Sequence, residues 1–194
     1  MRVAVFQFAS GADVSKNAEK IFGAIEQAAH EKVRLLVFHE CAACGYPPVE
    51  TPDIEQIDYS ALDSLFERVC QLTEKYDMFI ALGTIRRENS KRYNSLRMIS
   101  PKGELLGDYD KRALWGWDLN HFEKGSSRGV FDIDGVKVGL RICFEIRFPE
   151  YFRELFSERV ELCFISFSDV AETTSHQTII VKGEVEKSVS PILR

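Results

Sequence analysis

Three residues of this chain, Glu40, Lys111 and Cys143, have the side-chain types that a thiol-dependent catalytic site requires. A free cysteine has a pKa of about 8.5, so only a small fraction is the nucleophilic thiolate at neutral pH. A nearby ammonium group stabilises the thiolate, and a carboxylate accepts the thiol proton. The three side chains together predict covalent catalysis by Cys143. They also predict that Cys143 is alkylated faster at neutral pH than the other four cysteines.

Each of these residues taken alone also has an ordinary structural explanation. Free cysteines are among the most buried residue types, so a packed core position explains Cys143 as well. A single lysine or glutamate after a strand is typical of a solvated surface charge. The chemical interpretation therefore depends on whether the fold brings the three side chains together.

The hydrophobic pattern places all three residues at the ends of predicted strands. Apolar and polar residues alternate from Val136 to Ile142, which predicts a half-buried strand that ends at Cys143. Glu40 follows the apolar run 33–38, and Lys111 follows the predicted strand 105–109. Because α/β proteins usually carry their chemistry at the carboxyl ends of strands, these positions favour a shared site.

The rest of the pattern predicts one layered α/β domain over residues 1–194. A helix over 15–31 joins two parallel strands, and a second helix starts at Ser60 with Asp63 as its capping-box partner. Turn sequences at Pro101-Lys102-Gly103 and Asp134-Gly135 predict two hairpins, 93–99 with 105–109 and 130–133 with 136–143. Strands are also expected over 2–8, 78–85 and 161–167. Residues 172–194 are atypical and predict a frayed helix or tail.

A short helix is predicted between the strand that ends at Cys143 and the next strand. Pro149 is suited to its first turn, and the helix extends to about Ser157. We expect its inner face to carry Phe152, Leu155 and Phe156.

Composition and charge exclude several classes of protein. The net charge of −5 and the lack of a basic run disfavour a nucleic-acid partner. No apolar run approaches the roughly 18 residues of a membrane span, and no signal peptide is recognised, so we expect no membrane partner. Five cysteines, an odd number, favour a reducing compartment, and we expect a cytoplasmic protein with at least one free thiol.

Three other motifs favour structural interpretations. Cys41 and Cys44 have the spacing of a metal or redox pair, but no second pair accompanies them, so no metal is expected. The pair His39-Glu40 begins like a zinc-protease motif, yet position 43 is alanine. A set of His176, Asp169 and Ser166 or Ser168 is a remote alternative as a serine-hydrolase triad.

Three segments resemble the signature blocks of the nitrilase, or carbon-nitrogen hydrolase, superfamily, in the order of that family. They are FHECAACGYPP around Glu40, YDKRALW around Lys111 and RICFEIRFPE around Cys143. The opening RVAVFQF also resembles the family's first strand, so the resemblance covers roughly residues 1–170.

This resemblance implies a four-layer αββα sandwich and a Glu-Lys-Cys triad that needs no cofactor. By analogy, Cys143 attacks the carbonyl carbon of a small carboxamide, Glu40 moves the proton, and Lys111 holds the oxyanion. The backbone N–H of Phe144 is the implied second oxyanion donor. A thioester on Cys143 is then hydrolysed by water, and an amidase-like substrate such as a dicarboxylic acid monoamide is preferred to a nitrile or a carbamoyl amino acid.

Two further positions are implied less directly. Family members often carry a second acidic residue between the lysine and the cysteine, and Asp118 is preferred to Glu123 for that place. Arg147 and Glu150 are interpreted as an ion pair that fixes the turn after Cys143, with a substrate carboxylate as the alternative partner of Arg147.

The chain departs from the family pattern near its end. The family's later block, similar to Arg-Ala-x-Glu-Asn, is not found, and we expect the sandwich to lack its last strands. Such a sandwich exposes a sheet edge and part of an apolar face, so either the chain is a shortened form of the family's domain or an oligomer covers the gap; we expect a homo-oligomer. Two alternatives stay open: an inactive subunit that only binds or assembles, and a thiol acyltransferase with the same triad.

Overall fold

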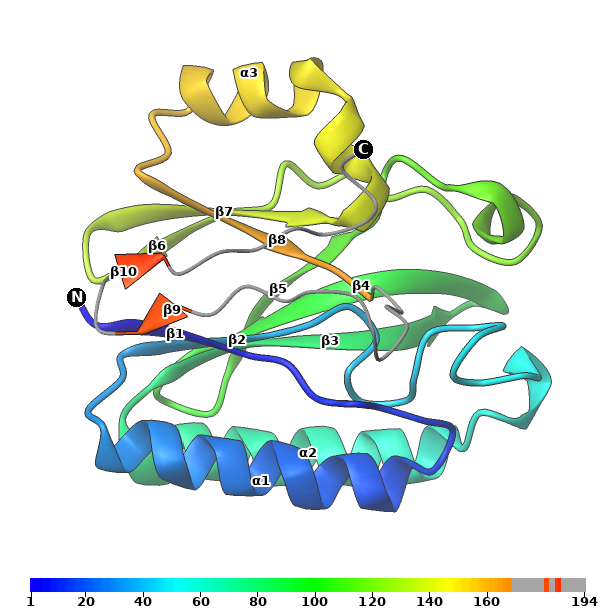
Figure 1. The fold of residues 1–194 in the computed structure, drawn as a ribbon, viewed down its shortest axis with the longest axis horizontal. Coiled ribbons are helices and arrows are strands. Elements are labelled where there is room, and N and C mark those ends of the chain that lie inside the picture. Colours follow the sequence, from blue (N-terminus) through cyan, green and yellow to red (C-terminus); the bar gives the residue numbers. More distant parts are fainter. Residues whose placement is uncertain (169–179, 182–183, 186–194) are drawn as a thin grey trace.

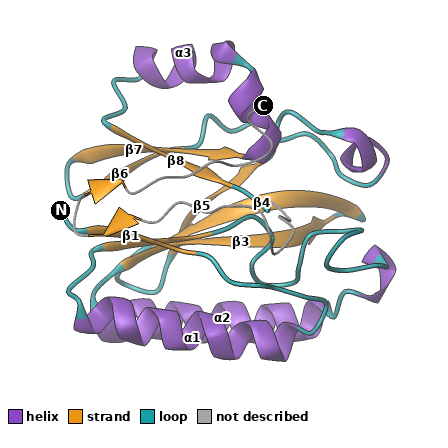
Figure 2. Ribbon diagram, in the orientation of Figure 1, coloured by secondary structure: helices purple, strands orange, loops and turns teal. Residues whose placement is uncertain are grey.

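The computed structural model describes residues 1–168, 180–181 and 184–185 of the 194 in the chain. Helices and sheets are stacked in four layers, in the order helices, sheet, sheet, helix (Figures 1 and 2). The strands are β1 Val3–Phe6, β2 Leu35–Phe38, β3 Phe79–Glu88, β4 Lys91–Ile99, β5 Leu105–Asp110, β6 Val130–Ile133, β7 Val136–Ile142, β8 Leu162–Ser166, β9 Ile180–Val181 and β10 Glu184–Val185. The helices are α1 Val14–His30, α2 Tyr59–Tyr76 and α3 Pro149–Ser157, with short 3₁₀ turns η1 Ile54–Gln56, η2 Gly116–Asn120 and η3 Cys143–Arg147. The expected αββα layering is confirmed.

The larger sheet has the strand order β1-β2-β3-β4-β5. Strands β1, β2 and β3 run parallel, while β4 and β5 are added antiparallel, which confirms the predicted parallel unit and the hairpin at Pro101-Lys102-Gly103. A further hairpin joins β3 to β4 and is not among the sequence predictions. It turns at Asn89 and Ser90, which adopt positive φ values of 47° and 67°.

Helix α2 starts one residue earlier than predicted. Its cap is Asp58, whose carboxylate accepts a hydrogen bond from the Ala61 amide at 3.0 Å. The predicted capping box between Ser60 and Asp63 is therefore wrong, because Asp58 already satisfies a free amide of the first turn.

The smaller sheet, β6-β7-β8, carries the predicted hairpin at Asp134-Gly135 and a parallel β7–β8 pair joined through α3. Leu155 is the buried residue of α3, while Phe156 is 85% exposed. The prediction that Phe156 faces inward is wrong, because consecutive helical residues point about 100° apart and Leu155 already occupies the inner face. Pro149 stands in the first turn of α3, as expected.

Two hydrophobic cores hold the layers together. One lies between α1, α2 and the larger sheet and includes Ile21 and Leu82, and the other lies between the two sheets and includes Val37 and Leu140. Val5 pairs with Val37 in register but is 72% exposed, so the inter-sheet core does not extend over β1 in the described part of the chain. None of the described helices has the length and apolar character that a membrane span requires.

Candidate active site

Glu40 lies two residues beyond the end of β2, and it is buried. Its Oε1 accepts hydrogen bonds from Lys111 Nζ at 2.9 Å and Asn94 Nδ2 at 2.7 Å. Its Oε2 accepts one from the Ser168 amide at 2.9 Å. Gly83 permits this arrangement, since a Cβ there would lie 1.9 Å from the His39 carbonyl oxygen beside Glu40. Glu40 is thus fixed by three donors from three different segments.

Lys111 follows β5 directly and is also buried, with 1% of its surface exposed. Its Nζ donates to Glu40 and, at 2.8 Å, to Asp118 Oδ2, while Asp118 Oδ1 accepts from the Tyr46 hydroxyl at 2.7 Å. Burial lowers the pKa of Lys111, but the carboxylates of Glu40 and Asp118 raise it further, and the net pKa lies above the ordinary value. The ammonium is therefore charged, and it is shared by two buried carboxylates.

Asp118 and Glu123, the two candidates for the second acidic position, occupy different environments. Asp118 lies in η2 and is fully buried against Lys111. The Glu123 side chain is 52% exposed and lies 3.8 Å from Lys91. Of the two, only Asp118 shares the environment of Glu40 and Lys111.

Cys143 follows β7 and opens η3 with a φ of +47°, a left-handed conformation that is costly for a residue with a side chain. Burial raises the pKa of the Cys143 thiol to about 12, together with the negative charge of Glu40, while Lys111 lowers it. The neighbouring ammonium is expected from the sequence to favour the thiolate. Burial and the charge of Glu40 outweigh the effect of Lys111, so the thiol is neutral at neutral pH.

Glu145 is buried and is not among the residues predicted from the sequence. One oxygen accepts from the Ile142 amide at 2.7 Å and the Tyr109 hydroxyl at 2.7 Å, and the other from the Arg112 amide at 2.6 Å. Glu145 thereby joins the strand end that precedes Cys143 to the loop that follows Lys111. The only sequence signal is an acidic residue two positions after the cysteine, within a largely apolar run.

Phe144 and Arg147 lie together in η3. The Arg147 guanidinium lies 5.5 Å from the centroid of the Phe144 ring. The first amides of a helical turn have no partner within the turn, so the Phe144 N–H is of the kind that can bind an oxyanion. The expected ion pair between Arg147 and Glu150 does not occur among the described residues, because Arg147 stacks on the aromatic ring instead.

The remaining motifs do not form a second site. Cys41 and Cys44 are free and buried, and burial raises the pKa of Cys41 well above its usual value. No cluster of three or more potential metal ligands occurs within residues 1–168 and the two short β-segments. Ser166 donates to the Phe38 carbonyl at 3.0 Å, and Asp169 and His176 lie outside the described residues.

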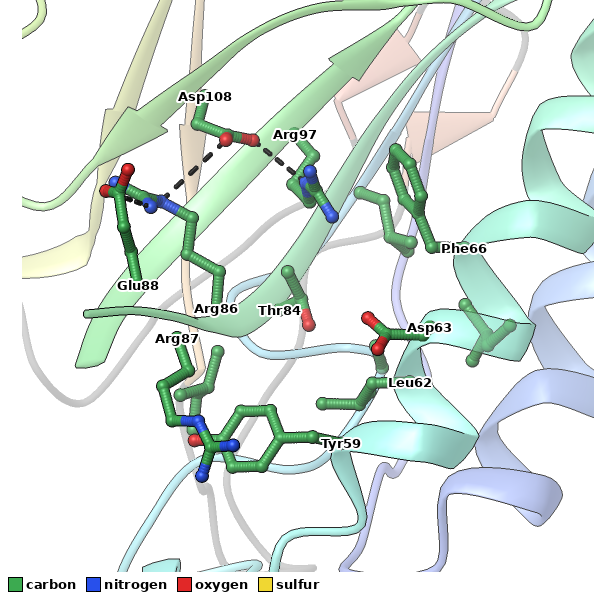
Figure 3. A pocket seen from close by; sticks show the side chains of 14 residues that line it. Tyr59, Leu62, Asp63, Phe66, Thr84, Arg86, Arg87, Glu88, Arg97 and Asp108 are labelled. Atoms are coloured by element: carbon green, nitrogen blue, oxygen red, sulfur yellow. Dashed lines mark hydrogen bonds and ion pairs between the residues drawn. The ribbon is translucent and has the colours of Figure 1, made fainter. Parts of the chain in front are cut away.

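A cavity of about 450 Å³ lies elsewhere, between α2 and strands β3 to β5 (Figure 3). Its polar wall contains Asp108, which pairs with Arg97 at 2.9 Å and with Arg86 at 3.8 Å. None of the three predicted catalytic residues lines it. This cavity and the cluster of Glu40, Lys111 and Asp118 thus share no residue.

The layering and the strand-end cluster together define the class of protein, an α/β sandwich of the nitrilase-superfamily type. A solved amidase from Nesterenkonia sp., described as a nitrilase-superfamily member, matches with a TM-score of 0.78 and 22% identity, over 90% of this chain and 67% of that chain. The chain belongs to the carbon-nitrogen hydrolase family, whose model matches residues 2–186.

Two curated relatives show how much of a longer protein the match covers. The glutamine-dependent NAD(+) synthetase of Aquifex aeolicus is 31% identical over 142 residues, which are 71% of this chain and 24% of that protein. The 2-oxoglutaramate amidase of Bacillus subtilis is 28% identical over 155 residues, 78% of this chain and 58% of that protein. The chain thus spans between about a quarter and three fifths of their lengths.

Proposed function

We propose that this chain is an amidase-like carbon-nitrogen hydrolase that cleaves a small carboxamide to an acid and ammonia through a Cys143 thioester. The observation that carries the proposal is the buried Glu40–Lys111–Asp118 cluster beside a strand-end thiol of strained backbone conformation. Family membership supports the same class of reaction.

Glu40 is the proposed general base, and its Oε2 is the proposed proton acceptor. A carboxylate oxygen has two lone-pair sites, and both sites on Oε1 are taken by Lys111 and Asn94. Among the described residues Oε2 accepts only the Ser168 amide, so we assign its second site to the thiol proton. The Cys143 sulfur bonds to the carbonyl carbon as its proton passes to Glu40, and the C–N bond then breaks as Glu40 returns the proton to the leaving nitrogen.

Lys111 and the Phe144 amide are the proposed oxyanion donors. An ammonium group has three N–H donors, and Lys111 uses two of them on Glu40 and Asp118. No acceptor for the third N–H lies among the residues that the structure describes, and we assign it to the negative oxygen of the tetrahedral intermediate. Water then attacks the thioester, with Glu40 again accepting a proton, which releases the acid and restores the thiol.

The proposed substrates are short monoamides of dicarboxylic acids. The Bacillus relative is named for 2-oxoglutaramate, a compound of this class. Arg147 lies in η3 close in sequence to Cys143, and no carboxylate pairs with it among the described residues, so it is the proposed partner of the distal carboxylate.

The test is ammonia release from 2-oxoglutaramate, glutaramate, succinamate and butyramide by the purified chain and by Cys143→Ala. We expect turnover that the substitution abolishes, with the three carboxylate-bearing amides preferred. Equal trace amounts of ammonia from the two proteins would refute hydrolysis by Cys143 and favour the alternative of an inactive subunit. Hydroxylamine added to the assay separates the remaining alternative, because hydroxamate formed faster than acid would identify a thiol acyltransferase.

We also propose a homo-oligomeric, cytoplasmic protein without a metal or other cofactor. The exposed Val5 and Phe156 provide apolar surface for self-association, and the five free cysteines fit a reducing compartment. Light scattering coupled to size exclusion measures the oligomeric state directly, and a monomer at micromolar concentration would contradict the first of these proposals.

A further inference from the structure

The carboxylate of Glu50 is not part of the Glu40–Lys111–Asp118 cluster, but it holds together three loops. Its Oε2 accepts from the Tyr46 amide at 2.8 Å, from the Ser10 hydroxyl at 2.9 Å and from the Ser168 hydroxyl at 3.4 Å. Ser10 follows β1, Tyr46 follows β2 and Ser168 follows β8. One oxygen atom thus holds segments that are as much as 158 positions apart in the sequence, as Ser10 and Ser168 are.

Two of these loops make direct contacts with the proposed catalytic groups. The Ser168 amide donates to Glu40 Oε2, the proposed acceptor of the thiol proton, at 2.9 Å. The Tyr46 hydroxyl donates to Asp118 Oδ1 at 2.7 Å, and the other oxygen of Asp118 binds Lys111. Glu50 is therefore one residue removed from the proposed base and two residues removed from the proposed oxyanion donor.

No cation lies within 4 Å of the Glu50 carboxylate among the described residues. The Ser10 hydroxyl that binds Glu50 also lies 3.1 Å from His39 Nε2. Burial lowers the pKa of His39 more than Glu50 raises it, so the imidazole is neutral. The charge of Glu50 is thus stabilised by neutral N–H and O–H donors, and such charge-assisted bonds are about twice as strong as neutral ones.

We propose that Glu50 is a positioning residue, which orients Glu40 through Ser168 and the Asp118–Lys111 pair through Tyr46. The inference rests on the proposed function, since it assigns these groups to the reaction. Displacement of a reacting group by about 1 Å can lower a rate by about 10²-fold, so anchoring of these loops acts directly on turnover. A purely structural role, closing the 46–50 turn through the Tyr46 amide and the Glu50 carboxylate at 2.8 Å, would affect stability alone.

The first experiment compares Glu50→Gln, which keeps the volume and removes the charge, with wild type and with Glu55→Gln. Glu55 is a matched control because its carboxylate, 69% exposed, forms an ion pair with Arg92 of strand β4. We expect Glu50→Gln to lower kcat by roughly 10- to 100-fold with KM within about threefold, because binding groups are left in place. Glu55→Gln is expected to stay within about twofold of wild type in both constants.

A double-mutant cycle tests the route through Ser168. Ser168→Ala removes the hydroxyl that binds Glu50 and keeps the amide that binds Glu40. We expect a loss of about two- to fivefold in kcat in wild type and no further loss in Glu50→Gln, because residues of one network are not additive. Fully additive losses would exclude this route.

A second readout needs no turnover. If Glu50→Gln displaces Glu40, the negative charge of Glu40 raises the pKa of the Cys143 thiol less, and modification of Cys143 by methyl methanethiosulfonate should accelerate by at least about threefold. A wild type without amidase activity would refute the proposed function, and the modification rate would then decide the inference by itself. Glu50→Gln that matches wild type in kcat and in modification rate overturns the inference, even where the melting temperature falls.

Discussion

Replacing Glu40 by glutamine should have opposite effects on two reactions of Cys143. Hydrolysis should fall, since the glutamine amide cannot accept the thiol proton, and general-base groups contribute about 10²- to 10⁴-fold to rates. Modification of the thiol by a small neutral disulfide-forming reagent should instead accelerate. The reason is that the charge of Glu40 is the second largest cause, after burial, of the raised thiol pKa.

The size of the acceleration follows from that pKa. The pKa of the Cys143 thiol rises from 9.0 to about 12, so the thiolate is rarer by a factor of about 10³ than in an unperturbed cysteine. A thiolate of lower pKa is also intrinsically less nucleophilic, which cancels about half of the gain on a logarithmic scale and leaves a ceiling near 30-fold. Burial persists in the variant, so we expect an increase of roughly 3- to 20-fold at pH 8.

The assay is timed modification by methyl methanethiosulfonate, followed by peptide mass mapping to separate Cys143 from the other four cysteines. Glu123→Gln is the matched control, because the Glu123 side chain is 52% exposed and its ion-pair partner is Lys91 and not a group of the site. Wild type should also show a rate that keeps rising from pH 7 to pH 10 without a plateau. Slower modification in Glu40→Gln, or a wild-type plateau near pH 7, would refute the view that the resting thiol is neutral.

Three further predictions concern the groups around the site. Lys111→Met leaves two buried carboxylates without their cation and should lower the free energy of unfolding in urea by about 3–5 kcal/mol, with partial recovery on adding Asp118→Asn; a loss below about 1 kcal/mol would contradict the buried pairing. Glu145→Gln should lower the free energy of unfolding by about 2–4 kcal/mol and reduce kcat, because the glutamine NH₂ group would face hydrogen-bond donors that the carboxylate now accepts from. Amide hydrogen exchange should be faster at the end of β7 in the variant. Asp134→Asn should lower the free energy of unfolding by less than about 1 kcal/mol at pH 7, since Asp134, which forms an ion pair with Arg34, is 48% exposed. The hydrogen bond from Arg34 lowers the pKa of Asp134, so its stabilisation is present above the ordinary value of 3.8 and is lost as the pH falls below it. Wild type and Asp134→Asn that differ in melting temperature by the same amount at pH 7 and pH 3 would contradict this.

The order of elements is predictable from local patterns, and so are the positions of the three proposed catalytic residues at strand ends. Alternation in β7, the apolar run of β2 and the turn at Pro101-Lys102-Gly103 each carry their own signal over a few residues. The β3–β4 hairpin lacks such a signal, because Asn89-Ser90 is not one of the common turn pairs. The prediction therefore fails where tertiary pairing and not the turn sequence sets the conformation.

Contacts between distant segments are the part that local patterns cannot supply. Asn94, Ser168 and Glu145 each hold a proposed catalytic group or its loop, yet each is an ordinary polar residue in the sequence. The direction of the pKa shift of the Cys143 thiol also depends on groups from distant segments, which are Glu40, Lys111 and Asp118. Burial and the charge of Glu40 raise the pKa of the Cys143 thiol by more than Lys111 lowers it, and this balance follows from the burial of the thiol and from the pairing of Lys111 with Glu40 and Asp118.

The charges of the cluster suggest why a neutral thiol suits the proposed reaction. At rest the site holds two carboxylates and one ammonium, which leaves one excess negative charge in a buried environment. When the thiol proton reaches Glu40 and sulfur bonds to the carbonyl carbon, that negative charge disappears from Glu40 and reappears on the substrate oxygen. The total is unchanged, and the charge moves toward the third N–H of Lys111 and the Phe144 amide. A thiolate formed by loss of its proton to solvent would instead add a second excess negative charge before the substrate arrives, which burial makes costly.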